Sequence, residues 1–167
     1  MYTNTDILQN KLTELEIRAY KDNIDIIAVC ETLPKELPVD TTKDDFKFVI
    51  KGFKAIQNNN GRGICVFIKD DVKYDLISVY DDIFNCSIVF KMKSFNDIFT
   101  ICLLYRSPNV TEHENDQILT LIDALNKDQT SPNHKLLLMG DFNVPTINWT
   151  LECTESIHRD DTKHFDS

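Results

Sequence analysis

The sequence is poor in the features that mark membrane, fibrous and disordered proteins. Four of its 167 residues are Gly and five are Pro, far fewer than collagen-like or Pro- and Gly-rich disordered chains contain. No apolar run approaches the roughly 18 residues that a membrane-spanning helix needs. The N-terminus also lacks the basic flank and apolar segment of a secretory signal. We therefore expect one ordered, intracellular domain with no membrane contact.

Positive charge is also scarce. Lys and Arg number 18 against 27 Asp and Glu, which gives a formal net charge of -9. This balance argues against a basic stripe that neutralises phosphates along a nucleic acid, so any such role must come from a local site. The five cysteines show no C-x-x-C spacing, which favours a reduced, intracellular protein. Those within apolar runs are Cys30, Cys65, Cys86 and Cys102.

Two stretches have the periodicity of amphipathic helices. From Thr5 to Tyr20, apolar residues recur at helical spacing between Lys, Glu and Gln, which predicts a helix with one buried face. Thr111 is followed three residues later by Glu114, a capping-box signal ahead of a second apolar series. The sequence therefore predicts one helix near each end of the region 5–125.

Short apolar runs bounded by turn formers predict several strands. A hairpin is predicted from residues 45–53 and 63–70, with turn formers between them. The other predicted strands cover residues 24–30, 73–80, 85–93, 97–105 and 136–139. Helices with a single apolar face must bury it, so this order of elements predicts an α/β or α+β fold with helices packed on sheets.

Three of the predicted strands end in polar residues. Glu31 follows "IIAVC", Tyr105 follows "ICLL", and Asp141 follows "LLLMG". Strand ends are where sites are often built, although a plain loop position is the commoner explanation for Glu31 or Tyr105 taken singly. The three positions are therefore candidates as a set.

The stretch Gly140-Asp141-Phe142-Asn143 is the most informative of these ends. Gly140 permits a close backbone approach, and in extended geometry Asp141 and Asn143 project to one side while Phe142 points inward. A helix cap or an Asx-turn would also explain Asp141. The sequence leaves both readings open.

Together the candidates have the chemistry of a phosphodiester site. Glu31 and Asp141 supply the hard oxygen atoms that Mg²⁺ prefers. Asn4 and Asn143 could donate to phosphate or orient those carboxylates. Tyr105 and Arg106 could stabilise charge on a phosphoryl group. These donors and acceptors all flank predicted strands or a predicted helix.

These residues stand in a recognisable order: "YTNTDILQNKLTEL", "DIIAVCETLP", "GRGICVFIK", "LLYRSP" and "LLLMGDFNVPTINW". The set resembles the endonuclease/exonuclease/phosphatase superfamily, which has the deoxyribonuclease I-like fold. More narrowly, it is similar to the endonuclease domain of non-LTR retrotransposons. The resemblance covers residues 4–150 and implies a four-layer sandwich, two β-sheets flanked by helices. Residues 151–167 would be a polar tail that begins the family's C-terminal part.

The resemblance implies a nuclease that depends on Mg²⁺, or alternatively Mn²⁺. Glu31 would bind the metal and Asn4 would support it, while Tyr105 would contact the scissile phosphate. Asp141 would orient and help to activate the attacking water, and Asn143 would contact the phosphate. DNA would be the partner in the active site, and the full-length element would add a reverse-transcriptase domain. The resemblance also implies a nuclear location.

The sequence departs from this family at both ends. The family's second half carries a further Asp and a Ser-Asp-His motif, and neither follows Trp149. Three residues precede Asn4, where relatives have a strand. We therefore expect a truncated domain with at most feeble nuclease activity, and we expect His158 and His164 to be surface residues. Abasic-site nucleases, inositol phosphatases, sphingomyelinases and a non-catalytic remnant are the alternatives.

Overall fold

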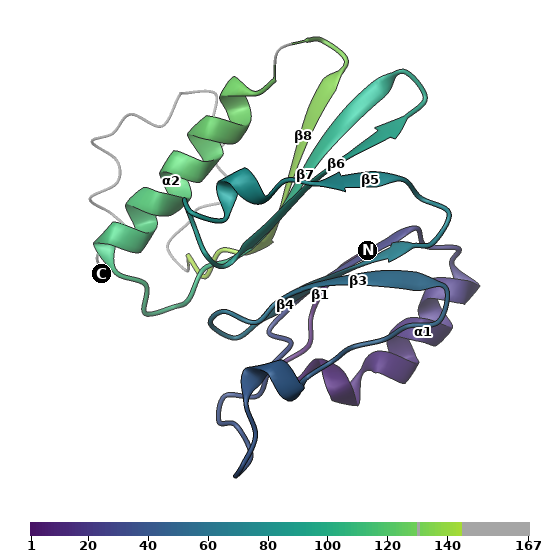
Figure 1. Ribbon diagram of the computed structural model, residues 1–167, viewed down its shortest axis with the longest axis vertical. Coiled ribbons are helices and arrows are strands. Elements are labelled where there is room, and N and C mark those ends of the chain that lie inside the picture. The colour runs from purple at the N-terminus through teal and green to yellow at the C-terminus, as the bar shows by residue number, and fades with distance from the viewer. Residues whose placement is uncertain (130, 145–167) are drawn as a thin grey trace.

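The protein is described here by a computed structural model that places residues 1–129 and 131–144 (Figure 1). Within those residues the chain forms two four-stranded β-sheets. The N-terminal sheet has the order β1 (Tyr2–Asn4), β2 (Ile26–Cys30), β4 (Ile64–Lys69) and β3 (Phe53–Asn58). The C-terminal sheet has the order β5 (Tyr74–Leu76), β6 (Ser87–Ser94), β7 (Asp97–Tyr105) and β8 (His134–Asp141).

The sheets and helices form four layers. Figure 1 shows α1 (Leu12–Lys21) against the outer face of the N-terminal sheet and α2 (Glu112–Lys127) against that of the C-terminal sheet. Short 3-10 helices are η1 (Leu8–Asn10), η2 (Lys43–Asp45) and η3 (Ser78–Tyr80). The predicted sandwich of two sheets flanked by helices is confirmed.

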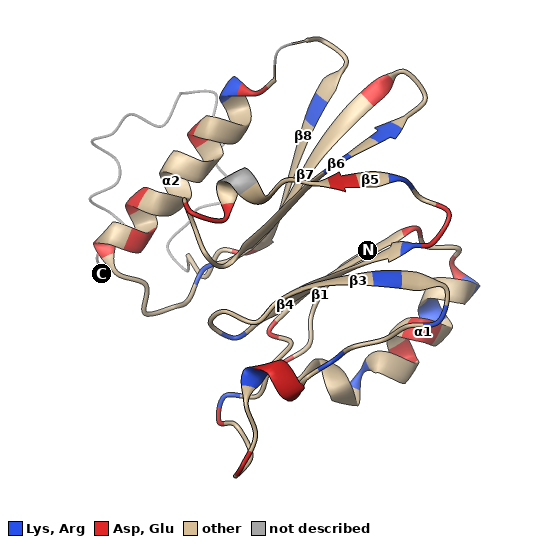
Figure 2. Ribbon diagram, in the orientation of Figure 1, with Lys and Arg blue, Asp and Glu red and all other residues tan. Residues whose placement is uncertain are grey.

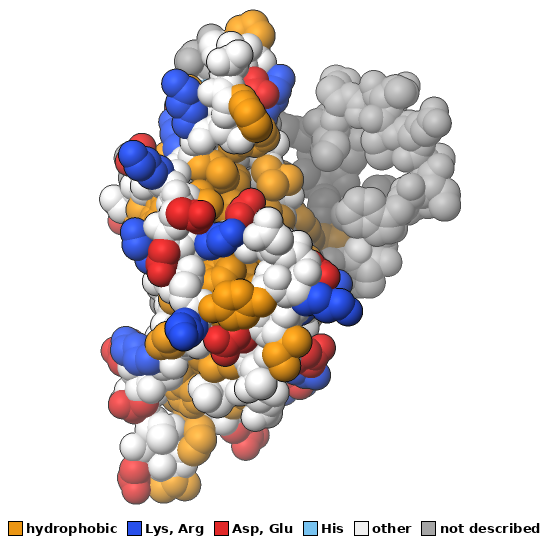
Figure 3. Space-filling view, turned by 90° about the vertical axis from the view of Figure 1, so that its right-hand side faces the viewer, with side chains coloured by type: hydrophobic (Ala, Val, Ile, Leu, Met, Phe, Trp, Pro, Cys, Tyr) orange, Lys and Arg blue, Asp and Glu red, His pale blue; other side chains and the backbone are white. Residues whose placement is uncertain are grey.

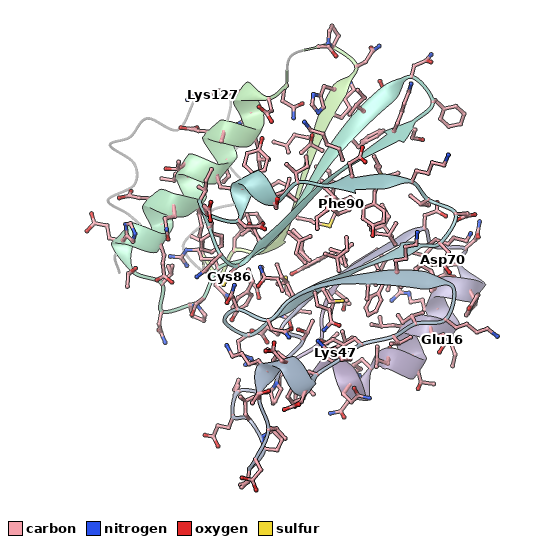
Figure 4. All side chains as sticks on the ribbon, in the orientation of Figure 1. Glu16, Lys47, Asp70, Cys86, Phe90 and Lys127 are labelled. Carbon is pink, nitrogen blue, oxygen red and sulfur yellow. The ribbon has the colours of Figure 1, made fainter. Side chains whose placement is uncertain are left out.

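Alternation along β2 shows how the layers are built. Ile27 and Val29 face the cluster that α1 covers, whereas Ala28 and Cys30 face the core between the sheets. Successive side chains of a strand point to opposite faces, so a run of apolar residues can serve two cores at once. From the C-terminal sheet, Phe90 fills the same inter-sheet core (Figure 4). The continuous apolar runs in the sequence therefore reflect burial on both faces.

Each sheet contains one parallel strand pair. β1 pairs with β2, with Asn4 opposite Cys30, and β7 pairs with β8, with Tyr105 opposite Asp141. The other neighbouring strands are antiparallel. Because parallel strands end at the same edge of a sheet, each pair brings its carboxyl-terminal residues together.

The predictions for the middle of the chain were confirmed in part. The strands β2, β6, β7 and β8 and the helix α2 with its Thr111 and Glu114 capping box are present. The hairpin before β4 is present too, but its first strand is residues 53–58, so the predicted strand at 45–53 was wrong. Residues 46–50 are irregular although Phe48 and Ile50 are buried.

A glutamine side chain explains that irregular segment. Gln57 on β3 accepts a hydrogen bond from the backbone N–H of Phe48 at 3.2 Å. Its amide also donates to the carbonyl of Phe46 at 3.1 Å. These bonds satisfy backbone groups that a strand partner would otherwise pair. Burial of alternate residues here therefore does not require a strand.

The N-terminal region differs from its prediction at two points. The helix expected from Thr5 begins as η1 and becomes α-helical at Leu12. A strand does lead into Asn4, since residues 2–4 form β1 and pair with β2. The domain boundary at residue 150, the tail 151–167 and the histidines His158 and His164 lie outside the described residues.

Charges of both signs are mixed along the described elements and on the face that Figure 3 draws. Figure 2 shows acidic residues along α2, whose last turn carries Lys127, and interspersed charges elsewhere. On the face in Figure 3, acidic, basic and hydrophobic side chains alternate without a basic stripe. Among the described residues, no helix is both long and apolar enough to cross a membrane.

Candidate active site between the two sheets

Four predicted site residues meet where the two sheets face each other. In the N-terminal sheet, Asn4 ends β1 and Glu31 follows β2. In the C-terminal sheet, Tyr105 ends β7 and Asp141 ends β8. The Asn4 amide donates to Oδ2 of Asp141 at 3.0 Å. The Tyr105 hydroxyl donates to Oε1 of Glu31 at 3.2 Å. Two hydrogen bonds thus join the sheets through these residues.

Glu31 is held in an unusual backbone conformation at the end of β2. Its φ of 57° lies in the left-handed region, which costs free energy for a residue with a Cβ atom. The Thr5 hydroxyl donates to the Glu31 carbonyl at 3.2 Å. The Glu31 side chain is 18% exposed, so its carboxylate is accessible and largely surrounded by protein.

Asp141 uses both carboxylate oxygens. Oδ2 accepts from Asn4, and Oδ1 accepts from the backbone N–H of Asn143 at 3.1 Å. The second bond is the Asx-turn that the sequence left as an alternative, and it coexists with the contact across the sheets. Phe142 packs against the core under α2, as predicted. The same short segment thus anchors and orients the carboxylate.

Asn143 does not have the extended geometry expected from the sequence. Its φ is 46°, so it does not simply share a strand face with Asp141. Its amide donates to the Arg106 carbonyl at 2.6 Å. This left-handed turn replaces the extended arrangement because the chain leaves β8 at Asp141.

Arg106 is 7% exposed, and its guanidinium donates hydrogen bonds to other protein groups. Its guanidinium donates to the Asn143 carbonyl at 2.8 Å and to Oδ1 of Asn115 at 2.9 Å. The Arg106 backbone N–H donates to the Asp141 carbonyl at 2.8 Å. These contacts tie the segment after β8 to the segment after β7. Phosphate contact by Arg106 or Asn143 stays a prediction.

The Tyr105 hydroxyl is protonated far above neutral pH. Burial, together with the Glu31 carboxylate that accepts its hydrogen bond, raises the pKa of Tyr105 to about 12. A phenol with a raised folded-state pKa stabilises the fold fully below its unfolded value of about 10 and loses that contribution as pH rises toward 12. Tyr105 can therefore act as a donor to a charged oxygen at physiological pH.

We expect the free energy of unfolding to fall between pH 10 and pH 12, and to fall less steeply in Tyr105→Phe. Urea unfolding across this pH range measures both slopes. Tyr80 is the matched control, because burial and its hydrogen bond to Asp128 raise its pKa to about 12 as well. Tyr80→Phe should also reduce the slope of the unfolding free energy against pH, while the hydrogen bond between Tyr105 and Glu31 stays in place. An unchanged slope in Tyr105→Phe would contradict the assignment.

The sequence did not identify two charged residues beside Glu31. Arg62, in the turn before β4, lies 2.6 Å from Oδ1 of Asp6 and 3.7 Å from Oε2 of Glu31. The hydrogen bond from Arg62 lowers the pKa of the Asp6 carboxyl. The stretch "GRG" is visible in the sequence, but nothing in its spacing links it to residues 6 and 31. Folding alone brings these three together.

The donor set suits a hard cation. Glu31 offers a carboxylate, and Asn4 offers an amide oxygen that already accepts from the Asp6 N–H at 3.3 Å. Across residues 1–129 and 131–144, no three His, Cys, Asp or Glu side chains gather into a metal-binding group. Mg²⁺ keeps several waters and takes one or two carboxylates beside other oxygen ligands. The oxygen atoms of Glu31 and Asn4 therefore fit Mg²⁺.

Comparison with known proteins identifies the fold. No protein-family model matches the sequence, and no curated protein is detectably similar to it. Among solved structures, the endonuclease domain of TRAS1, a telomere-specific non-LTR retrotransposon, matches with a TM-score of 0.61 and 16% identity. An AP endonuclease from Leishmania major matches with a TM-score of 0.64 and 12% identity. The 3′ phosphatase NExo from Neisseria, bound to product DNA, matches at 0.51 and 14%.

The match spans most of this chain and part of each neighbour. It covers 87% of this chain and 60% of the TRAS1 domain. The corresponding values are 86% and 54% for the Leishmania enzyme, and 88% and 58% for NExo. The chain thus spans little more than half the length of these structures. It has the fold of these structures, the deoxyribonuclease I-like fold.

Proposed function

We propose that this chain, which has the deoxyribonuclease I-like fold, is part of a Mg²⁺-dependent phosphodiester hydrolase of the retrotransposon type. The observation that carries the proposal is the pairing of Asn4 with Asp141 and of Glu31 with Tyr105 across the two sheets. A merely structural polar contact would not require two carboxylates, an amide and a phenol at one edge. Nucleases and phosphatases among the fold neighbours support the reaction class.

Each residue has a role that its contacts support. Glu31 and Asn4 would hold Mg²⁺, which when bound supplies a Lewis acid beside the phosphate. Tyr105 would donate a hydrogen bond to a phosphate oxygen and keep its proton, because its pKa is raised. Asp141, fixed at both oxygens, would orient the attacking water and accept its proton.

Arg106 and Asn143 hold the segment that carries Asp141. Their mutual hydrogen bonds hold the segment after Asp141 against the end of β7. Arg106 would act mainly as a positioning residue, because its guanidinium is buried and already paired. Asn143 would reach phosphate after releasing the Arg106 carbonyl. In this proposal Arg106 keeps Asp141 in place through its backbone N–H, which donates to the Asp141 carbonyl.

The biological setting follows from the same proposal. The substrate would be chromosomal DNA, and the nick would supply a 3′-hydroxyl end for a reverse-transcriptase domain of the element. Such a reaction places the protein in the nucleus. Since the formal net charge is -9, DNA would be held mainly at the active site rather than over a wide area.

We expect slow nicking of supercoiled plasmid in Mg²⁺, and no nicking in EDTA or in Glu31→Ala. Loss of a metal ligand should lower the rate to background, that is, by about a hundredfold or more. Conversion of supercoiled to open-circular DNA on agarose gels measures the rate. Glu16→Ala, at a half-buried position on α1, is the matched control and should nick like wild type. Equal rates in wild type and Glu31→Ala would overturn the proposal.

A second candidate is a non-catalytic interaction module of the same fold. It is favoured by one observation: the formal net charge of -9 opposes a wide contact with the phosphates of a nucleic acid. A module of this kind would show no Mg²⁺-dependent nicking and no Glu31-dependent binding of a divalent cation. Direct measurement of cation binding therefore distinguishes a site that binds the metal without catalysing nicking from a surface that does not bind the metal.

A further inference from the structure

Arg62 places a positive charge inside the candidate metal site. Its side chain is 17% exposed, and its terminal nitrogen Nη2 lies between the Asp6 and Glu31 carboxylates, at 2.6 Å and 3.7 Å. Glu31 therefore has the Tyr105 hydroxyl at one oxygen and the guanidinium near the other. The carboxylate that suits Mg²⁺ already has a cationic neighbour supplied by the chain.

The turn before β4 is built to keep Arg62 in this place. Gly61 and Gly63 flank it with φ values of 56° and 74°. A Cβ atom on Gly63 would lie 2.3 Å from the Thr32 hydroxyl oxygen and 2.8 Å from Leu33. Glycine is thus required for the close approach of this turn to the segment that follows Glu31.

Three hydrogen bonds fasten the turn to that segment. The backbone N–H of Leu33 donates to the Arg62 carbonyl at 2.9 Å, and that of Thr32 donates to the Gly63 carbonyl at 3.2 Å. The Arg62 Nε–H donates to the Leu33 carbonyl at 3.2 Å. The guanidinium is therefore fixed at its base, and its outer nitrogen reaches the two carboxylates.

We propose that Arg62 is a positioning residue that balances the charge of Glu31 and competes with the divalent cation for that carboxylate. The inference rests on the proposed function, since it concerns the metal that Glu31 would hold. Two like charges a few ångströms apart repel strongly where water is partly excluded. Cation binding must therefore weaken the contact between Arg62 and Glu31.

Asp6 makes this exchange possible. It is the nearer partner of Nη2 and is itself well exposed, with 68% of its side chain accessible. When a cation binds Glu31, the guanidinium keeps the Asp6 carboxylate as its counter-charge. Two ion pairs of Arg62 are described, one with Asp6 and one with Glu31. If Asp6 is replaced, the pair with Glu31 is the one that remains. The two acidic residues thus have opposite effects on the affinity of the site.

Isothermal titration of the full chain with Mn²⁺ or Mg²⁺ tests this competition. We expect Arg62→Gln to bind the cation about tenfold more tightly than wild type, because a repulsive charge is removed. Arg62→Lys keeps the charge and should stay close to wild type. Asp6→Asn should bind several-fold more weakly, because Arg62 is then held by Glu31 alone. Equilibrium unfolding checks that each variant is folded.

Lys43→Gln is the matched control for charge. Lys43, in η2, donates to the carbonyl of Gly61, which lies in the same turn as Arg62, at 3.0 Å. Among the described hydrogen bonds and ion pairs, none joins Lys43 to Glu31. This variant removes one positive charge nearby and should leave cation affinity within about twofold of wild type. If it tightens binding as much as Arg62→Gln, the effect is one of net charge and the inference is wrong.

The outcomes separate this inference from the proposed function. Binding that Glu31→Ala abolishes, together with unchanged or weaker affinity in Arg62→Gln, would overturn the competition and leave the metal site standing. No Glu31-dependent binding in either wild type or Arg62→Gln would overturn both. Tighter binding in Arg62→Gln without any nicking would support the inference and place the failure in catalysis.

Discussion

Gly140→Ala is expected to destabilise the protein by on the order of 3 kcal/mol or more. A Cβ atom at Gly140 would lie 1.9 Å from the Leu104 carbonyl oxygen, which belongs to the backbone of the neighbouring strand. The φ of 152° adds a conformation that residues with a side chain rarely adopt. Neither the oxygen nor its strand can move away without breaking the pairing of β7 with β8.

Equilibrium unfolding in urea, followed by circular dichroism, measures this loss. Gly52→Ala is the matched control, since Gly52 also has positive φ, 77°, but its added Cβ would meet only the Tyr20 hydroxyl at 3.5 Å. That change should cost about 1 kcal/mol, the conformational penalty alone. If the two variants lose equal stability, the close approach at Leu104 is not what Gly140 provides.

Asp141→Asn is expected to reduce Mg²⁺-dependent nicking by about a hundredfold or more while the fold is kept. The asparagine has the same shape, but its amide cannot take a proton from water. It also has one acceptor oxygen and a donor NH2 group where the carboxylate has two acceptor oxygens, so the contact with Asn4 or Asn143 is disturbed. Rates of plasmid nicking over long incubations in Mg²⁺ and in Mn²⁺ measure the loss.

Asp116→Asn is the control for that experiment. Asp116 is exposed on α2, and its replacement makes the same change of charge away from the site. It should nick at the wild-type rate. Thermal melting of both variants checks that they are folded. Nicking by Asp141→Asn at the rate of wild type would remove Asp141 from the proposed mechanism and leave the role of Glu31 to be judged separately.

Most of the site residues that could be predicted from the sequence lie at the ends of predicted strands. Glu31, Tyr105 and Asp141 each interrupt an apolar run, and a change from buried to polar residues marks a sheet edge without knowledge of the fold. The pairing across the sheets could not be read this way. Asn4 and Asp141 are 137 positions apart, and their meeting depends on how two sheets stack.

Arg62 and Gln57 show why the other features of the site and fold could not be predicted from the sequence. Both lie near a turn, and both act on segments far away in sequence: Arg62 on Asp6 and Glu31, Gln57 on the backbone at residues 46–48. Periodicity reports which face of an element is buried, but it does not report where a long polar side chain will reach. Alternating burial at residues 46–50 therefore resembled a strand although a side chain satisfies its backbone.

Because each sheet contributes half of the paired residues, the site is sensitive to the alignment of the two layers. A slide of one sheet over the other by about 1 Å would lengthen the Asn4–Asp141 and Glu31–Tyr105 contacts together, and misplacement on this scale can cost a large part of a catalytic rate. The hydrophobic core between the sheets could absorb such a slide without unfolding. Activity should thus be lost before structure, and substitutions in the inter-sheet core can inactivate the protein while it remains folded.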